Sequence, residues 1–259
     1  MKIAIIGAGN MGGAIARGLA KGCQIPTAEI IVSNPSAGKL KALKDEFPEI
    51  QTTSNNREAA KGAEIILLAV KPWYVEAVLK EINMDTDHQL LVSVAAGISL
   101  DQLIAWAGSN PQLPVFRVIP NTAISQLESM TVISAKNTSQ QQEDAVSALF
   151  EEMGQVMFLA EDKLSAATAL ASCGIAYVLK YVQAAMQAGI ELGLPANVSQ
   201  QLLAQTVKGA AQLLMNQQTH PVLEIEKVCT PGGITIKGVN TLDIEGFSAA
   251  IIKAMKASC

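Results

Sequence analysis

Glycines near the N-terminus have the type and spacing needed to bind a phosphate. The motif Gly7-Ala8-Gly9-Asn10-Met11-Gly12 follows the apolar run Lys2–Ile6 and precedes apolar residues that repeat at helical spacing. A strand, Gly-x-Gly-x-x-Gly and a helix, in this order, form the dinucleotide-binding fingerprint. Gly7 permits a tight turn, Gly9 lets a pyrophosphate approach the backbone, and Gly12 lets the helix pack closely on the sheet. The complete motif favours a phosphate site at the helix N-terminus over a tight turn that binds nothing.

The end of the second predicted strand, Glu29–Ser33, indicates which dinucleotide is bound. Enzymes that prefer NAD usually carry Asp or Glu here to hold the ribose 2′-hydroxyl. This chain has Asn34 and Ser36 instead, with Lys39 one turn further on. These groups could donate hydrogen bonds to a 2′-phosphate, so the sequence predicts NADP, with NADPH preferred and NADH as the alternative. Asn34 and Ser36 could instead, or in addition, cap the next helix.

Three later strand ends carry residues that suit the rest of such a cofactor, because ligands of doubly wound sheets bind at the carboxyl ends of the strands. Ala69-Val70-Lys71-Pro72 has small residues that would admit a ribose, and Lys71 is either a cofactor contact or a solvated lysine. Ala95-Ala96-Gly97 is small enough for a nicotinamide to lie against the backbone, or simply for close packing. In Arg117–Thr122, Asn121 could bind the nicotinamide amide or form a turn with Pro120.

The stretch Cys229-Thr230-Pro231-Gly232-Gly233-Ile234-Thr235 suggests a second anion site. We expect a helix here with Thr230 at its cap and Pro231 at its first position. Gly232 and Gly233 would then bare backbone N–H groups for a small carboxylate, and Thr235 would offer its hydroxyl to the same ligand. A well-capped helix start is the plainer interpretation, but glycine costs a helix about 1 kcal/mol relative to alanine.

The predicted elements that position these residues change character along the chain. Up to about residue 158 strands and helices alternate, which predicts a Rossmann-type, doubly wound, mainly parallel sheet in residues 1–159. From Glu161 no strand is predicted: a long helix, Glu161–Leu192, and further helices make residues 160–259 an all-α domain. These helices are alanine-rich and apolar on more than one face, so we expect a homo-oligomeric interface in preference to packing on the chain's own sheet alone.

Composition excludes several classes of protein. The net charge is −4 and only 4% of residues are aromatic, which argues against nucleic acid as a partner. The start lacks the features of a signal peptide, and uninterrupted apolar runs such as Ile65–Val70 are too short to cross a bilayer, so we expect a cytoplasmic protein without a membrane partner. The four cysteines, Cys23 among them, show no Cys-x-x-Cys pairing, and with two histidines they predict no metal site.

In these motifs the chain resembles the pyrroline-5-carboxylate reductase family over essentially its whole length. The resemblance is carried by the glycine motif, Ala69–Pro72, Val94–Gly97, Pro120–Thr122, Gly174 with Ala176-Tyr177, His220-Pro221, and Thr230–Thr235 through Leu242-Asp243. It implies reduction of 1-pyrroline-5-carboxylate to L-proline with NAD(P)H. It also implies a helical C-terminal dimerisation domain, a homodimer or a multimer of dimers, and a substrate site shared between two subunits.

The resemblance also implies roles for single residues. It places the cofactor on Ile6, the motif residues Gly7 to Met11, and the strand ends at Ala69–Pro72 and Ala95–Gly97, with Asn34, Ser36 and Asn56 at the adenosine end. The substrate is expected on Asn121 and on Cys229, Thr230, Gly232, Gly233, Ile234 and Thr235. The chain departs from the family at Ala123 and Ile175, where proline is usual, at Ile234, where Thr or Ala is usual, and at Glu224, where an aliphatic residue is usual.

The predicted chemistry is reduction of a C=N bond by positioning. A cyclic imine is basic enough to arrive partly protonated near neutral pH, so no strong general acid is needed. Neither His88 nor His220 lies in a cofactor loop, which disfavours a histidine-based ketone reductase. Thr235 is the expected catalytic residue. A related reductase of another small cyclic imine or keto acid, and a non-enzymatic dinucleotide-binding regulator, stay open as alternatives.

Overall fold

The structure, a computed structural model, describes residues 1–22, 25–108 and 110–259, without the side chain of residue 217. Cys23, one of the four cysteines considered above, lies outside the described residues. The chain divides into two compact units, a sheet unit, Met1–Ser172, and a helical unit, Cys173–Cys259. Each unit is described by itself below.

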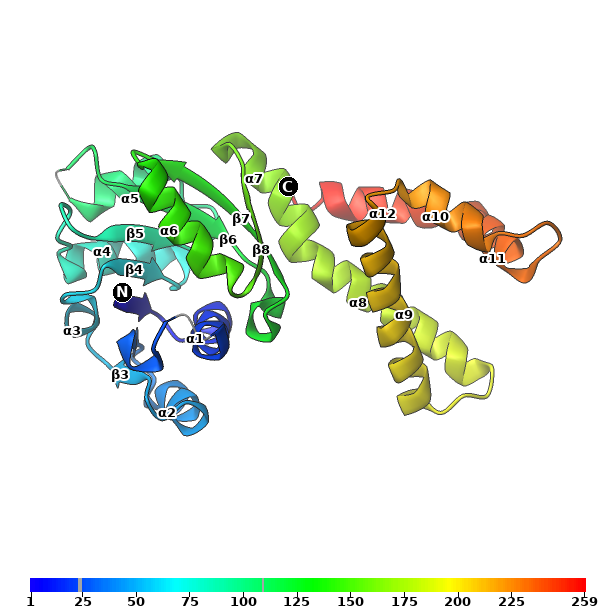
Figure 1. Cartoon of the computed structure of the whole chain (residues 1–259), viewed down its shortest axis with the longest axis horizontal. Helices are drawn as coiled ribbons and strands as arrows, with labels where there is room; N and C mark the ends of the chain where they lie inside the picture. Colours follow the sequence, from blue (N-terminus) through cyan, green and yellow to red (C-terminus); the bar gives the residue numbers. More distant parts are fainter. Residues whose placement is uncertain (23–24, 109) are drawn as a thin grey trace. The chain divides into compact units, whose positions relative to one another are not determined.

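The sheet unit is built on one eight-stranded sheet in the order β3-β2-β1-β4-β5-β6-β7-β8 (Figure 1). Neighbouring strands are parallel except β6 and β7, which are antiparallel. The predicted mainly parallel, doubly wound sheet is therefore confirmed. The strands are β1 (Ile3–Ile6), β2 (Ile30–Ser33), β3 (Gln51–Thr53), β4 (Ile65–Leu68), β5 (Leu90–Ser93), β6 (Val115–Ile119), β7 (Ser129–Lys136) and β8 (Gly154–Phe158).

Helices cover both faces of this sheet, so its central strands are buried on both sides (Figure 1). In β1, Ile3 and Ile5 pack on one face, while Ala4 and Ile6 pack on the other. This explains the continuous apolar runs, which are typical of parallel strands. The helices are α1 (Asn10–Gly22), α2 (Ala37–Glu46), α3 (Asn56–Ala60), α4 (Val75–Ile82), α5 (Leu100–Ala107) and α6 (Gln140–Glu151), with 3-10 turns at Thr27–Glu29, Pro72–Tyr74 and Thr122–Gln126.

Local signals predicted some of these elements accurately and missed one. The spacing of Ser99 and Gln102 is that of a capping box and predicts a helix over Leu100–Ala107 with Ser99 as its N-cap. This prediction is confirmed, because Ser99 caps α5 by accepting a hydrogen bond from the Gln102 backbone N–H. Strand β3 was not predicted, because Gln51–Thr53 is only three residues long and carries no buried side chain. It is a strand because its backbone pairs with β2.

A helical run from Glu161 to Glu191 leads from the sheet unit into the helical unit. It begins with a 3-10 turn, Glu161–Lys163, and α7 (Leu164–Ala167), and it ends with α8 (Gly174–Glu191). Between them lies a π-helical turn, Thr168–Cys173. The predicted long helix is therefore present, but it is not regular.

The helical unit also contains α9 (Ala196–Gln217), α10 (Pro221–Val228), α11 (Ile234–Ile244) and α12 (Phe247–Lys256). Helix α8 packs on α9, and a Cβ on Gly189 would lie 2.7 Å from Ser199 Oγ. Helix α10 was missed because His220-Pro221 signals a break; Pro221 is instead its first residue and His220 its N-cap.

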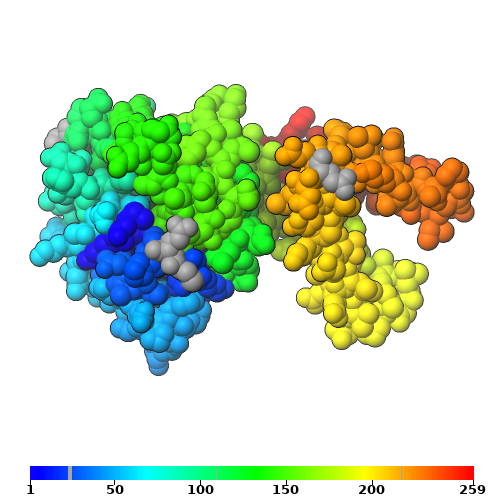
Figure 2. Space-filling view, viewed as in Figure 1, coloured from blue at the N-terminus to red at the C-terminus, as the bar shows by residue number. Residues whose placement is uncertain are grey.

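The helical unit leaves large apolar side chains exposed. Its helices α8 and α9 are drawn in yellow tones in the space-filling view (Figure 2). Leu179 is 61% exposed, Leu202 54% and Ile252 54%. In the part of the chain that the structure describes, the last buried apolar residue is Ala169. An 18-residue window of the run Glu161–Glu191 has a mean hydropathy of 1.3, so this helix is long and apolar enough to cross a membrane by length and composition alone, which is weak evidence for a membrane span. The same surface suits a helix that another subunit covers.

Candidate functional site

The glycine loop joins β1 to α1 as the fingerprint predicts. Gly7 has φ +108°, and a Cβ there would lie 2.7 Å from the Ala69 carbonyl oxygen. A Cβ on Gly12 would lie 2.0 Å from the Gly7 carbonyl oxygen. By contrast, a Cβ on Gly9 would meet no atom within 4 Å. The chain itself therefore requires glycine at 7 and 12, whereas Gly9 leaves open the space that a pyrophosphate needs at the start of α1.

Asn34 ties the end of β2 to this loop. Its Oδ1 accepts a hydrogen bond from the Ala8 backbone N–H at 3.0 Å, and its Nδ2 donates to the Ser36 carbonyl at 3.3 Å. The residue is buried, so its amide supports the loop from behind. Ser36 occupies the N-cap position of α2 without a side-chain cap bond. The capping alternative for these two side chains is therefore wrong, and the exposed Ser36 hydroxyl does not bond to the helix start.

A cleft of about 440 Å³ opens beside the glycine loop. It brings together the loop, α1, α2 and the 3-10 turn Thr122–Gln126, and its polar and charged lining residues are Asn10, Arg17, Lys39, Thr122 and Ser125. Among the residues that the structure describes, no ion pair joins Lys39 to a carboxylate. Sequence reasoning included Thr122 in the strand end Arg117–Thr122 but did not identify Ser125 as a cleft residue, because only the fold brings it to the glycine loop.

Arg17 contributes its positive charge differently from Lys39. Its Nε and Nη2 donate to the two carboxylate oxygens of Glu46 at 2.7 and 2.6 Å. This hydrogen-bonded pair raises the pKa of the Arg17 guanidinium and lowers the pKa of the Glu46 carboxyl. Since the charge of Arg17 is already balanced by the Glu46 carboxylate, Lys39 is the cation of the cleft that is best able to bind a phosphate.

The remaining predicted cofactor residues lie at the same carboxyl edge of the sheet. Ala69 and Val70 are half-buried behind the glycine loop, and the exposed Lys71 precedes Pro72 at the N-cap of a 3-10 turn. Ala95 is buried, while Ala96 and Gly97 are exposed. Asn56, at the start of α3, accepts a hydrogen bond from Ser33 Oγ at 2.7 Å and donates to Glu81 at 2.9 Å.

Two aromatic residues at this edge were missed. Trp73 is 71% exposed and Tyr74 56%, and their ring centroids lie 6.0 Å apart. Aromatics make up only 4% of the chain, so an adjacent pair directly after Lys71-Pro72 was a signal that could have been used. Exposed rings at a nucleotide-binding edge offer a face on which a base can stack.

Arg117 and Asn121 turn inward rather than toward the cleft. Arg117 Nη1 donates to Glu161 Oε1 at 3.1 Å, and the same oxygen accepts from the Leu100 backbone N–H at 2.8 Å. Asn121 is 5% exposed, and both ends of its amide have partners, the Ala123 N–H and the Ala171 carbonyl. Of the two interpretations of Asn121, the structure supports the turn-forming one.

The Thr230–Thr235 stretch differs from the expected helix start. Helix α11 begins at Ile234 with Gly233 as N-cap, so Thr230 is not the cap and Pro231 is not a helical residue. The Gly233 N–H donates to the Thr230 carbonyl at 2.9 Å, and Gly232 has φ +73°. Pro followed by a positive-φ glycine favours a β-turn over a helix start. The turn therefore uses the Gly233 N–H.

The free donors of this loop lie one residue further on. The first backbone N–H groups of a helix lack intrahelical partners. In α11 these groups are the N–H groups of Ile234, Thr235 and Ile236. Thr235, at the second helical position, is exposed beside them, and Ile234 is 87% exposed. Cys229 is half-buried just before the turn. The loop can thus receive a small anion, but on the helix amides and not on both glycines.

Glu224, one of the departures from the family pattern, has polar partners of its own. Its carboxylate accepts hydrogen bonds from Thr219 Oγ1 and, at 2.7 Å, from Lys227 Nζ. These bonds, that of Lys227 first, lower the pKa of Glu224. The acid therefore replaces an aliphatic residue without leaving a carboxylate unpaired.

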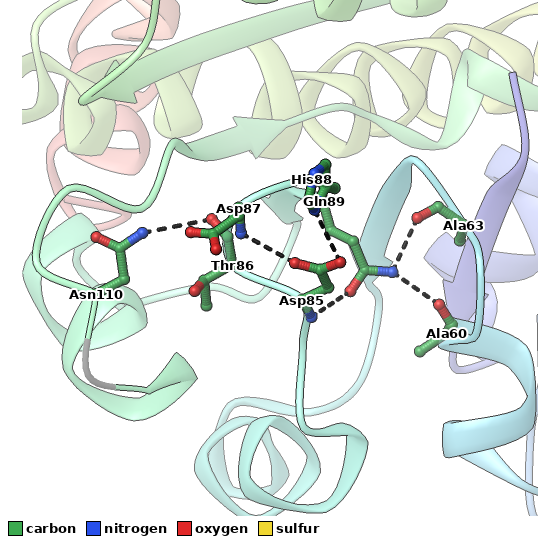
Figure 3. A network of polar contacts seen from close by, with 8 residues as sticks. All are labelled: Ala60, Ala63, Asp85, Thr86, Asp87, His88, Gln89 and Asn110. Atoms are coloured by element: carbon green, nitrogen blue, oxygen red, sulfur yellow. Dashed lines mark hydrogen bonds and ion pairs between the residues drawn. The ribbon is translucent and has the colours of Figure 1, made fainter.

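A network of polar contacts lies away from the cofactor edge, around the loop before β5 (Figure 3). His88 Nδ1 lies 3.0 Å from Asp85 Oδ2, just before the amino end of β5. The buried Gln89 donates to the carbonyls of Ala60 and Ala63 at 2.8 Å each. Gln89 thereby fastens the loop before β5 to the segment before β4. This His–Asp pair has a structural setting, and no cluster of three metal-ligating side chains occurs in the described ranges.

Comparison with known proteins agrees with this geometry. Residues 161–259 match the family model "Pyrroline-5-carboxylate reductase dimerisation", and residues 2–97 match "NADP oxidoreductase coenzyme F420-dependent". A pyrroline-5-carboxylate reductase of Synechocystis sp. is 35% identical over 260 residues, covering 100% of this chain and 96% of the relative. Pyrroline-5-carboxylate reductase 2 of Dictyostelium discoideum is 36% identical, covering 99% and 90%.

Solved structures give the same result. The chain matches a Plasmodium falciparum pyrroline carboxylate reductase with NADP bound at a TM-score of 0.90 and 28% identity, covering 100% of this chain and 95% of that one. A Streptococcus pyogenes 1-pyrroline-5-carboxylate reductase matches at 0.88 and 30%, covering 100% and 96%. With its glycine-loop cleft, its helical second unit and relatives matched end to end, the chain belongs to the pyrroline-5-carboxylate reductase family.

Proposed function

We infer that the protein reduces 1-pyrroline-5-carboxylate to L-proline with NADPH. The observation that carries this proposal is that one member of this family has two glycine-containing helix starts that could each receive an anion, the open glycine loop at α1 and the turn before α11. The first fits a dinucleotide pyrophosphate, and the second fits a single carboxylate. In the reaction a hydride adds to C5 of the imine and a proton to its nitrogen, so that the C=N bond becomes a C–N single bond.

The chain's own residues bind and orient the reactants. Backbone N–H groups at the start of α1 would hold the pyrophosphate, while Ser36 and Lys39 would hold the 2′-phosphate. Ala95–Gly97 would let the nicotinamide, which supplies the hydride when bound, lie close to the backbone. Asn34 supports this cleft through Ala8 and is not proposed as a direct phosphate ligand.

The α11 loop would hold the substrate. We propose that the Ile234, Thr235 and Ile236 amides bind the substrate carboxylate and that the Thr235 hydroxyl orients the ring nitrogen. The cyclic imine arrives already protonated in part, so no side chain needs to deliver the proton as a strong acid.

The active form proposed is a homo-oligomer with a dimer as its smallest unit. The dimerisation match covers residues 161–259, and the apolar side chains of α8, α9 and α12 need a cover. We propose a boundary between the two functional domains at 159/160, supported by the start of that match; limited proteolysis would test it. A cytoplasmic location is also a proposal, which cell fractionation would check.

An NADPH-oxidation assay tests this function. Purified protein is given pyrroline-5-carboxylate, a six-membered cyclic imine carboxylate, a keto acid, or no second substrate. Oxidation that is fastest with pyrroline-5-carboxylate is the expected result. Faster turnover of another imine or keto acid would favour a related reductase, which the exposed Ile234 at a family Thr or Ala position makes the second candidate. NADPH binding without oxidation by any of them would indicate a regulator.

A further inference from the structure

The π-helical turn Thr168–Cys173 interrupts the helical run that leads out of the sheet unit. Such turns widen a helix by one residue and redirect backbone carbonyls away from the usual ladder. The carbonyl of Ala171, within this turn, accepts a hydrogen bond from Asn121 Nδ2 at 3.0 Å. Asn121 follows β6, fifty residues earlier in the chain. The turn thus has a tertiary partner within the sheet unit.

Asn121 also organises one wall of the cofactor cleft. Its Oδ1 accepts from the Ala123 N–H at 2.9 Å, and its carbonyl accepts from the Ile124 N–H at 3.1 Å. These bonds start the 3-10 turn Thr122–Gln126, whose residues Thr122 and Ser125 line the cleft beside the glycine loop. Its own N–H donates to Ser129 Oγ at 3.2 Å. One buried side chain therefore holds both the cleft wall and the widened helical turn.

We propose that Asn121 is a positioning residue for the reaction. Both ends of its amide are bonded to protein groups, so in this proposal it acts on the reaction through other residues. Its amide group holds the π-helical turn against the segment that follows β6. Since the same amide caps the turn bearing Thr122, one side chain links the cleft wall to the π-helical turn within the sheet unit. This proposal rests on the proposed function only through its kinetic readout.

The residue at position 175, Ile175, bears on the role of the hydrogen bond from Asn121 to Ala171. In an α-helix the Ile175 N–H would bond to the carbonyl four residues earlier, which is that of Ala171. The family that the sequence resembles usually has proline here, which lacks that N–H and would itself prevent a regular helix. This chain has no proline at 175, yet the Ala171 carbonyl bonds to Asn121. The tertiary hydrogen bond thus supplies the constraint that the local sequence lacks.

Asn121→Asp separates the two hydrogen bonds. The aspartate keeps an oxygen that can accept from the Ala123 N–H. When the carboxyl group is ionised, its second oxygen faces the Ala171 carbonyl and cannot donate to it. When the carboxyl group is protonated, it can donate a hydrogen bond to that carbonyl. Asn121 contacts uncharged groups of Ala123, Ile124, Ser129 and Ala171. The charged groups on the two connected elements are Arg117 on β6 and Glu161, Asp162 and Lys163 at the start of the helical run.

The expected kinetic result is a new pH dependence. At alkaline pH kcat with pyrroline-5-carboxylate should fall about three- to tenfold, the loss of one hydrogen bond, and it should recover as the pH falls through the pKa of the introduced carboxyl. The NADPH dissociation constant should change less than twofold, because the cap on Ala123 is kept. The matched control is Asn137→Asp, since Asn137 Nδ2 also donates to backbone carbonyls, those of Pro111 and Leu113. The control should lose stability without acquiring this pH dependence.

Hydrogen exchange of the backbone amides in residues 168–176, measured on the intact protein, provides a readout that does not require activity. Exchange in Asn121→Asp should be faster than in wild type at alkaline pH and should return toward wild type on acidification. Asn121→Ser, which retains a capping oxygen but is too short to reach Ala171, should exchange faster at every pH and serves if the Asp variant does not fold. If both variants match wild type or the Asn137→Asp control, the proposal is overturned. If wild type fails to reduce the imine while the exchange result holds, only the proposed function fails.

Discussion

The sheet unit and the helical unit both present a helix N-terminus preceded by glycines, but they support it in different ways. In the sheet unit the glycine loop stands on buried strands and on the buried Asn34 amide. In the helical unit the turn before α11 stands on helices that, over the described residues, bury no apolar side chain. The described lining residues of the first cleft all come from the sheet unit of one chain. The second lies on a unit whose apolar surface requires another copy of the chain, so substrate binding should depend on assembly more than cofactor binding does.

The largest expected effect comes from introducing a charged residue on the apolar surface of the helical unit, which tests whether substrate binding depends on assembly. Leu179→Glu should dissociate the oligomer and lower imine reduction by more than about a hundredfold, because an unpaired charge buried in an interface costs about 3–5 kcal/mol. NADPH binding, measured by fluorescence titration, should persist. Light scattering reports the assembly, which in wild type should bury more than ~2,000 Å².

Lys61→Glu, at an exposed residue of the sheet unit, is the control for that charge. It should leave both the assembly and the activity unchanged. A Leu179→Glu monomer that reduces the imine at the wild-type rate would contradict the idea that the second site requires a partner.

Thr235→Ala tests the substrate site alone. It should cost about 1.5–3 kcal/mol of transition-state stabilisation, the value of a hydrogen bond to a charged group, seen in kcat/KM for the imine with NADPH affinity unchanged. Thr235→Ser retains the hydroxyl and should recover much of the activity. Thr230→Ala should act mostly on KM, since Thr230 builds the turn and does not reach the reacting atoms. If Thr235→Ala reduced the imine at the wild-type rate, the Thr235 hydroxyl would have no role in the reaction.

Two alanine substitutions test the glycine loop. Gly9→Ala should raise the NADPH dissociation constant about tenfold, equivalent to 1.4 kcal/mol, with little change in stability, since the added Cβ meets only open space. Gly12→Ala should destabilise the fold by about 1–3 kcal/mol or more, because its Cβ would collide with the Gly7 carbonyl. Denaturation midpoints and NADPH titration separate the two effects. Equal NADPH affinity in Gly9→Ala and wild type would place the pyrophosphate elsewhere.

Cofactor preference tests the end of β2. Wild type should use NADPH at least as well as NADH, because no acidic residue directly follows this strand. Ser36→Asp should shift the ratio of the two kcat/KM values toward NADH by about tenfold, through repulsion of the 2′-phosphate. Gln141→Asp on α6 adds the same charge elsewhere and should not change the ratio. A wild-type preference for NADH would refute this assignment.

The smallest expected effect is on acid stability. The pKa of Glu46 is lowered by Arg17 and that of Glu224 by Lys227 and Thr219. A depressed carboxyl pKa stabilises the folded state above the unfolded-state pKa, and this contribution is lost as the pH falls through the folded-state pKa. Glu46→Gln and Glu224→Gln should each flatten the decline of the thermal midpoint below about pH 5. Only the Glu224 effect should depend on protein concentration, if its unit unfolds with the oligomer. Midpoints that decline as steeply as in wild type would argue against both pairs.

The sequence alone determined the features that depend on neighbouring residues. Apolar runs predicted β1, β4 and β6, and the Ser99–Gln102 capping box predicted the start of α5. The glycine spacing predicted the loop at α1, and the resemblance identified the family. These signals are readable because strand burial, helix periodicity and capping are set within a few residues along the chain.

The tertiary structure decided what distant residues do to one another. Asn34 bonds to Ala8 and not to its own helix, and Asn121 bonds to Ala171 rather than facing a ligand. In the turn before α11 the Gly233 N–H donates to the Thr230 carbonyl, whereas the sequence predicted that this N–H would be available to a ligand. In an unfolded chain each of these polar groups could form hydrogen bonds of similar strength with several different partners. Which one it takes depends on the elements that packing brings within about 3 Å, and no local pattern encodes that choice.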